Sequence, residues 1–156
     1  MSEPGVPQPD ADLLRLIALD AEDLAIVSAH VQDAVLRVAD INWLAREMHF
    51  VLGMNRFVWE AASVGSWRKR DYQRRRSALH FARVTKVQSI GIDRHSDAVL
   101  ELLAISFEPV DPPSGDVLLD FAGGATIRLS VEVLEVELTD LGPAWSTPLA
   151  PRHVVT

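Results

Sequence analysis

Residues 98–108 have the sequence AVLELLAISFE, and this stretch decides the fold class. Successive side chains of a β-strand point to opposite sides, and here both sides are apolar. One side carries Val99, Leu103, Ile105 and Phe107, and the other carries Leu100, Leu102 and Ala104. A strand that is apolar on both sides is typical of the middle of a sheet, so this stretch predicts a sheet that continues on either side of it.

Apolar alternation recurs before and after this stretch and predicts further strands. The expected strands cover residues 13–19, 34–43, 50–59, 77–92, 117–121 and 127–138. The apolar side changes near Ala39-Asp40, Asn55-Arg56 and Val133-Leu134, which indicates β-bulges. A short helix starting at Val133-Leu134 is the alternative for residues 131–141, although the β-branched residues there favour a strand. Gly123-Gly124 predicts a hairpin turn, because a primed turn needs positive φ.

One helix is expected, over residues 21–32. Asp20 is a suitable N-cap, and the two acids Glu22 and Asp23 favour the positive end of the helix dipole. Leu24, Val27 and Val31 follow at helical spacing. We therefore predict an α+β domain of mainly antiparallel sheet, with about seven long, bulged strands that form a curved sheet or a partly closed barrel.

The chain of 156 residues fits one domain. We expect this domain over residues 13–145, with a disordered tail at 1–12, a long basic loop at 61–76 and an irregular tail at 146–156. Residues 1–12 lack the basic and apolar regions of a secretory signal. The chain also contains no uncharged apolar run of the length that crosses a bilayer, which takes ~18 residues.

Cysteine is absent, which excludes disulfides, thiolate nucleophiles and thiolate metal sites. This composition suits a reducing compartment, so we expect a soluble, cytoplasmic protein. The formal net charge is −7. An acidic protein does not wrap nucleic acid over its whole surface, so contact with a polyanion would be local.

The most distinctive segment is basic and flanked by aromatic residues. Residues 68–76 hold six Arg or Lys against the single acid Asp71. Guanidinium groups pair with carboxylates and phosphates, and aromatic rings stack on bases. The predicted binding residues are Trp67, Arg68, Lys69, Arg70, Tyr72, Arg74, Arg75 and Arg76. The alternative is a solvated loop whose arginines meet acids of the same domain or of a second copy.

No motif predicts catalysis, a cofactor or a metal. The five histidines have no His-x-x-x-His spacing, although His49 and His80 could meet across neighbouring strands. Serine and threonine do not occur in the Gly-x-Ser-x-Gly context of a nucleophile elbow. We therefore expect no metal and no cofactor, and a protein that is not an enzyme.

Several stretches together resemble a bacterial family of unknown function, domain of unknown function 2948. The resemblance rests on residues 16–20, 22–24, 28–34, 55–57, 59–60, 75–79, 100–105, 121–124, 140–145 and 151–153. It covers nearly the whole chain, from about Leu13 to His153. The resemblance implies no activity, because no reaction, ligand or partner is established for the family.

Three functions follow as hypotheses. The leading one is a non-enzymatic interaction module that binds an acidic protein or other anion through the basic segment 67–76. The second is a nucleic-acid-binding protein that uses the same segment. The third is an enzyme whose site is assembled from scattered residues such as His49, His80 and Arg56. The position of the basic segment relative to the deepest pocket should discriminate a small anion from a larger partner.

Overall fold

The computed structural model describes residues 13–58, 72–142 and 145–147. These residues form an α+β fold with one α-helix and an eleven-stranded sheet, which confirms the predicted class. The elements are β1 (Arg15–Ala18), α1 (Ala21–His30), β2 (Val35–Arg37), η1 (Val38–Asp40), β3 (Ile41–Leu44), β4 (His49–Phe57), β5 (Tyr72–Phe81), β6 (Val84–Ile90), β7 (Val99–Pro109), β8 (Gly115–Phe121), η3 (Ala122–Gly124), β9 (Thr126–Val131), β10 (Val136–Asp140) and β11 (Trp145–Thr147). In the described part of the chain, no helix is long and apolar enough to cross a bilayer.

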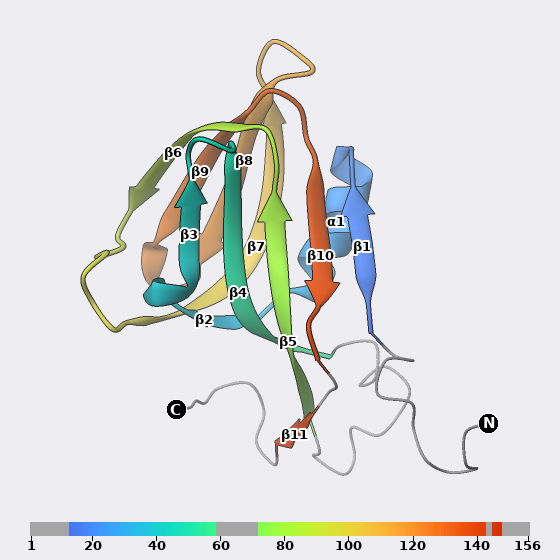
Figure 1. Cartoon of the computed structure of the whole chain (residues 1–156), viewed down its shortest axis with the longest axis vertical. Coiled ribbons are helices and arrows are strands. Elements are labelled where there is room, and N and C mark those ends of the chain that lie inside the picture. Colours follow the sequence, from blue (N-terminus) through green and yellow to red (C-terminus); the bar gives the residue numbers. More distant parts are fainter. Residues whose placement is uncertain (1–12, 59–71, 143–144, 148–156) are drawn as a thin grey trace, which may run out of the picture.

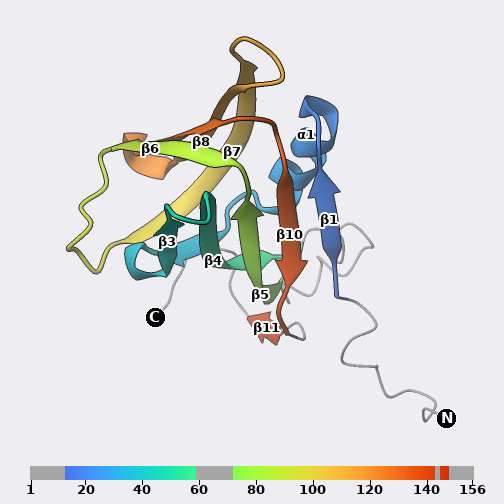
Figure 2. The ribbon, with the colours of Figure 1, turned by 45° about the horizontal axis from the view of Figure 1, so that its top comes forward.

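Every strand pair is antiparallel, and the main order is β1-β10-β5-β4-β2-β7-β8-β9-β6. β3 pairs with β4 and β11 pairs with β5, both outside this path. The sheet curls around its core without closing (Figure 1), and a second view shows the same open curl (Figure 2). The prediction of a curved, mainly antiparallel sheet is therefore confirmed, and the sheet remains open.

The helix begins where its sequence predicts. The Asp20 side chain accepts a hydrogen bond of 2.8 Å from the Asp23 backbone N–H. Leu24 and Val27 are buried, and α1 lies against β1 and β7. The Ser28 hydroxyl also accepts from the Ile105 N–H at 2.9 Å, which ties the helix to the central strand β7.

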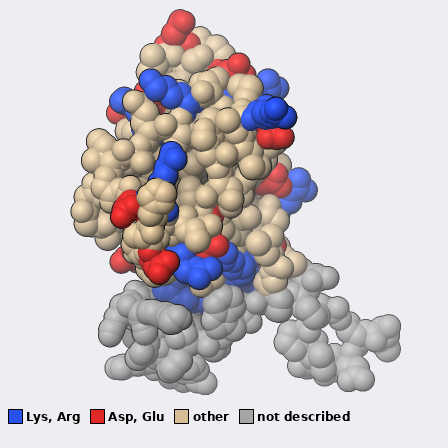
Figure 3. Space-filling view, turned by 60° about the vertical axis from the view of Figure 1, so that its left-hand side comes forward, with Lys and Arg blue, Asp and Glu red and all other residues tan. Residues whose placement is uncertain are grey.

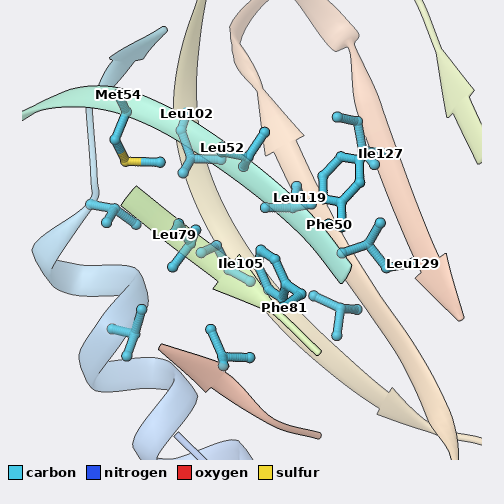
Figure 4. Close-up of a cluster of buried hydrophobic side chains, with 14 of the residues drawn as sticks. Phe50, Leu52, Met54, Leu79, Phe81, Leu102, Ile105, Leu119, Ile127 and Leu129 are labelled. Atoms are coloured by element: carbon cyan, nitrogen blue, oxygen red, sulfur yellow. The ribbon is translucent and has the colours of Figure 1, made fainter. Parts of the chain in front are cut away.

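The core lies on the concave side of the sheet, between the strands and α1. Side chains from β4, β5, β7, β8 and β9 point toward one another there (Figure 4). The labelled residues include Phe50, Leu52, Leu79, Phe81 and Leu129, all at most 1% exposed. The core therefore joins segments from almost the whole length of the chain.

The strands are shorter and more numerous than the predicted seven, because turns interrupt three of the expected long strands. The expected bulge near residues 39–40 is the 3₁₀ turn η1, which separates β2 from β3. The expected strand 77–92 is the end of β5 followed by β6, with a turn at residues 82–83 in which Arg83 has φ 61°. The change of apolar side near residues 39–40 thus marked a change of strand.

The central strand β7 differs from the prediction of a strand that is apolar on both sides. The strand does have partners on both sides, β2 and β8. Its register against β8 shifts between Leu102 and Ala104, so Leu100 and Ile105 both face the core while Leu103 is exposed. One bulged, buried side therefore replaces the two apolar sides that we predicted.

The Gly123-Gly124 turn is confirmed, and both glycines have positive φ, 85° and 87°. The turn is longer than two residues, since Phe121 N–H donates to the Ala125 carbonyl across it. Residues 131–141 form no helix. β9 ends at Val131, and β10 lies near the other end of the strand order, where it pairs with β5 and β1. Residues 145–147 are a strand, β11, where an irregular tail was expected from 146 onward.

Candidate functional site

The basic segment divides between two parts of the molecule. Trp67, Arg68, Lys69 and Arg70 lie outside the described residues, and so does the side chain of Tyr72. β5 begins at Tyr72, so the prediction of a loop through residue 76 is wrong from 72 onward. Because side chains alternate along a strand, Arg75 faces the core side of β5, whereas Arg74 and Arg76 face the opposite side.

Arg75 belongs to a buried polar cluster at one end of the sheet. This cluster consists of Arg56 from β4, Arg75 and Ser77 from β5, and Asp140 from β10, and we call it the arginine cluster. Each residue continues the inward-facing positions of its strand. Arg56 follows Phe50, Leu52 and Met54 at alternate positions, without the bulge predicted at residues 55–56. Polar residues therefore occupy positions that the pattern assigns to the core.

Asp140 is the centre of the arginine cluster. Arg56 donates to it twice, from Nε to Oδ1 and from Nη2 to Oδ2, each at 2.9 Å. Ser77 Oγ donates to Oδ1 at 2.6 Å, and the Leu14 N–H donates to Oδ2 at 2.9 Å. Burial alone would raise the pKa of Asp140, but these hydrogen bonds outweigh it and hold the pKa below its ordinary value.

Arg75 has no such complement of acceptors. Its Nε lies 3.6 Å from Asp140 Oδ2, which is an ion-pair distance and too long for a hydrogen bond. Nε and Nη1 are buried and have no acceptor in the described part of the chain. Two guanidinium groups thus face one carboxylate, and Arg56 donates to both oxygens of that carboxylate. Among the described residues, the arginine cluster therefore holds two positive charges against one negative charge.

The other two arginines of β5 also have partners within the fold. Arg76 Nη2 lies 3.4 Å from Asp40 Oδ2, with its side chain 40% exposed. Arg74 donates to the Asn55 carbonyl at 3.1 Å. Burial lowers the pKa of Arg74, against the opposing fields of Asp33 and Glu101. At Arg76 the geometry matches the alternative prediction, an arginine that meets an acid of the same domain.

Positive side chains gather at this end of the molecule (Figure 3). In this view a group of Lys and Arg lies at the lower end of the described part. The strands β4 and β5 both run to this end, where Val58 leaves the sheet and Tyr72 enters it. Of the predicted binding residues, the structure describes the side chains of Arg74, Arg75 and Arg76, and of these only Arg75 belongs to the arginine cluster.

The residues of the enzyme hypothesis do not form one site. His49 and His80 do meet across neighbouring strands, with ring centroids 4.4 Å apart and the rings nearly perpendicular. They lie on the outward side of β4 and β5, whereas Arg56 is fully buried on the inward side. The described residues contain no group of three or more His, Asp or Glu that could hold a metal. This arrangement provides no shared pocket for the three side chains.

The histidine pair predicts a pH effect on stability. Burial, and then the neighbouring His49, lower the pKa of His80. The unfolded chain therefore binds a proton at higher pH than the folded protein does, so stability falls as the pH drops below about 6.5. We expect His80→Gln to reduce the difference in urea midpoint between pH 7.5 and pH 5.5. The exposed His95, changed to Gln, is the control, and an equal reduction in both variants would contradict this assignment.

The fold and site together define a class: an α+β domain with an open, curved antiparallel sheet and a buried cluster of charged residues at one end. A family model described as a protein of unknown function (DUF2948) matches residues 14–153, and the chain belongs to that family. The resemblance found in the sequence is thereby confirmed. Among curated proteins and among solved structures, no match was found.

Proposed function

We propose that this protein is a non-catalytic interaction module that binds an acidic partner at the arginine cluster. The observation that carries the proposal is the buried guanidinium of Arg75, whose Nε and Nη1 lack an acceptor among the described residues. Arg75 shares the carboxylate of Asp140 with Arg56, and a buried cation that is incompletely paired costs several kcal/mol, by the general cost of ion burial. A carboxylate from a partner would supply both the missing charge and the missing acceptors.

The geometry of a guanidinium favours a carboxylate for this purpose. Two of its N–H donors can pair with the two oxygens of one carboxylate in parallel, and such hydrogen bonds are roughly twice as strong as neutral ones. Arg56 and Asp140 already show this arrangement within the fold. We propose the same arrangement for Arg75 and an acidic side chain of the partner.

The position of the pocket supports a larger partner over a small free anion. A pocket of about 440 Å³ lies between β3 and β6, and no arginine of the arginine cluster lines it. The cationic site is therefore separate from the cavity that would enclose a small molecule. The basic residues Arg68, Lys69 and Arg70 precede β5 in the chain, and their part in binding remains a prediction.

Arg75→Met tests the proposal, because it removes the excess charge and keeps much of the side-chain volume. We expect a fluorescein-labelled peptide of alternating Glu and Ser to bind the wild type, and Arg75→Met to weaken binding at least tenfold in fluorescence anisotropy. Stability should stay within about 1 kcal/mol of wild type, or rise, since replacing a surplus buried charge with an apolar group is often neutral or favourable.

The matched control is Arg128→Met, which removes an arginine that is paired with Asp116 in the other half of the sheet. This variant should bind the acidic peptide like wild type. The same peptide with Gln in place of Glu should not bind. Equal binding by Arg75→Met and wild type, with both folded, would refute the arginine cluster as the site.

Nucleic-acid binding remains the second hypothesis for the same end of the molecule. Single-stranded RNA and DNA in the same assay, titrated with salt, distinguish the two, because phosphate contacts give a steep loss of affinity with salt. Tighter binding of the nucleic acids than of the acidic peptide would favour it. We also propose a cytoplasmic location, which is supported by the lack of cysteine.

A further inference from the structure

The curved sheet is open along one seam, between β3 and β6. Of the described strands, β3 pairs only with β4, and β6 pairs only with β9. One hydrogen bond joins the two sides at one end, where the Val84 N–H donates to the Met48 carbonyl at 2.8 Å. β3 and β6 lie on the same side of the molecule in both ribbon views (Figures 1 and 2). The seam therefore opens away from this hydrogen bond.

A pocket of about 440 Å³ fills the seam. Ile41 and Trp43 of β3 form one wall, and Val87 of β6 forms part of the other. Phe50 and Ile127, which are 1% and 2% exposed, belong to the core and form the floor. Pockets that bind small molecules have volumes of roughly 300 to 1,000 Å³ and mostly apolar walls, so this pocket has the dimensions of a ligand site.

Two polar side chains line the pocket, Ser89 and Arg94. Arg94 is exposed and forms no ion pair with a carboxylate of the described residues. Its charge is therefore free to attract an anion to the pocket.

We propose that the seam pocket binds a small amphipathic carboxylate, with its hydrocarbon part against Trp43, Phe50 and Ile127 and its carboxylate on Arg94. Burial of each methylene group should strengthen binding about fourfold. The charge-assisted hydrogen bonds to Arg94 fix the orientation of the ligand. This site lies apart from the arginine cluster and does not depend on the function proposed there.

Decanoate is a suitable probe, with decanol and decyltrimethylammonium as its neutral and cationic counterparts. We expect isothermal titration of the full chain to show saturable decanoate binding, at least tenfold tighter than that of either counterpart. Methyl NMR signals of Ile41, Val87 and Ile127 should shift on titration, which locates the ligand in the wild type without any substitution.

Arg94→Gln should weaken decanoate binding about tenfold or more and leave decanol binding unchanged. Arg46→Gln is the matched control, since Arg46 is exposed, lies in the β3–β4 turn and does not line the pocket. Val87→Trp, from the wall, should fill the pocket and abolish binding of both ligands, with its fold checked by circular dichroism.

Three results would overturn the proposal. The first is the absence of saturable decanoate binding to the wild type. The second is equal affinity for decanoate and decanol, which would remove the role of Arg94. The third is binding of an extended apolar peptide, with protection of the β3 and β6 edge amides, in place of decanoate. That result would assign the seam to strand addition, in which a peptide pairs with free sheet edges.

Discussion

Asp140→Asn should lower the free energy of unfolding by about 3 to 5 kcal/mol, the cost of removing one partner from a buried ion pair. The substitution keeps the shape of the side chain and removes its charge. Arg56 and Arg75 would then both lose the charged carboxylate of Asp140, and the hydrogen bonds that Ser77 Oγ and the Leu14 N–H donate to this side chain would be weakened. Since a domain is stable by only about 5 to 15 kcal/mol, this is a large fraction of the total.

Urea denaturation followed by circular dichroism measures this loss. Asp120→Asn is the control, because Asp120 is exposed and its side chain accepts a long hydrogen bond, 3.3 Å from Thr126 Oγ1. We expect the control to change stability by less than about 0.5 kcal/mol. A loss for Asp140→Asn no greater than that of the control would show that the arginine cluster does not stabilise the fold.

The second large effect is expected at Gly115, the first residue of β8. A Cβ atom at this position would lie 2.5 Å from Phe107 Cζ and 2.6 Å from the Glu108 carbonyl oxygen. The carbonyl belongs to the backbone of the paired strand β7, so it cannot move aside without disturbing the ladder. We expect Gly115→Ala to cost about 1 to 3 kcal/mol, the usual range for overpacking.

Thermal or urea unfolding compares this variant with Gly142→Ala. A Cβ at Gly142 would meet nothing within 4 Å, and its φ is not in the left-handed region. Gly142→Ala should leave stability unchanged or raise it slightly, because alanine reduces the freedom of the unfolded chain. If the two variants had equal effects, the close approach of β7 and β8 at Gly115 would not be the cause.

Local signals in the sequence predicted several features correctly. Asp20 caps the only helix of the described residues, as the acids after it indicate, and Gly123-Gly124 adopt positive φ in a hairpin connection. Both features depend on interactions within a few residues, namely side-chain capping and backbone sterics. Contacts of this short range are recorded directly in the local sequence.

The arginine cluster escaped prediction because charged residues were treated as interruptions of the apolar pattern. Arg56 and Arg75 face each other in the β4–β5 register, and Asp140 continues the inward side of β10. The usable signal was the alternation itself. Arg56 and Asp140 each lie two residues after an inward-facing apolar residue, Met54 or Leu138, and Arg75 lies four residues before Leu79. The pairing of opposite charges across strands becomes visible only once the register is known.

By itself, the sequence determined the class of fold, the helix with its cap and the central position of residues 98–108, because each depends on periodicity or on local hydrogen bonds. Only the tertiary structure decided which charges are free. Strand β5 turns Arg75 toward the core side, where β10 brings Asp140 close to it. The same strand turns Arg76 to the opposite side, where Asp40 of η1 lies close to it. Charge in a sequence is a sum over residues, whereas electrostatic energy depends on distance and burial, which only the folded chain defines.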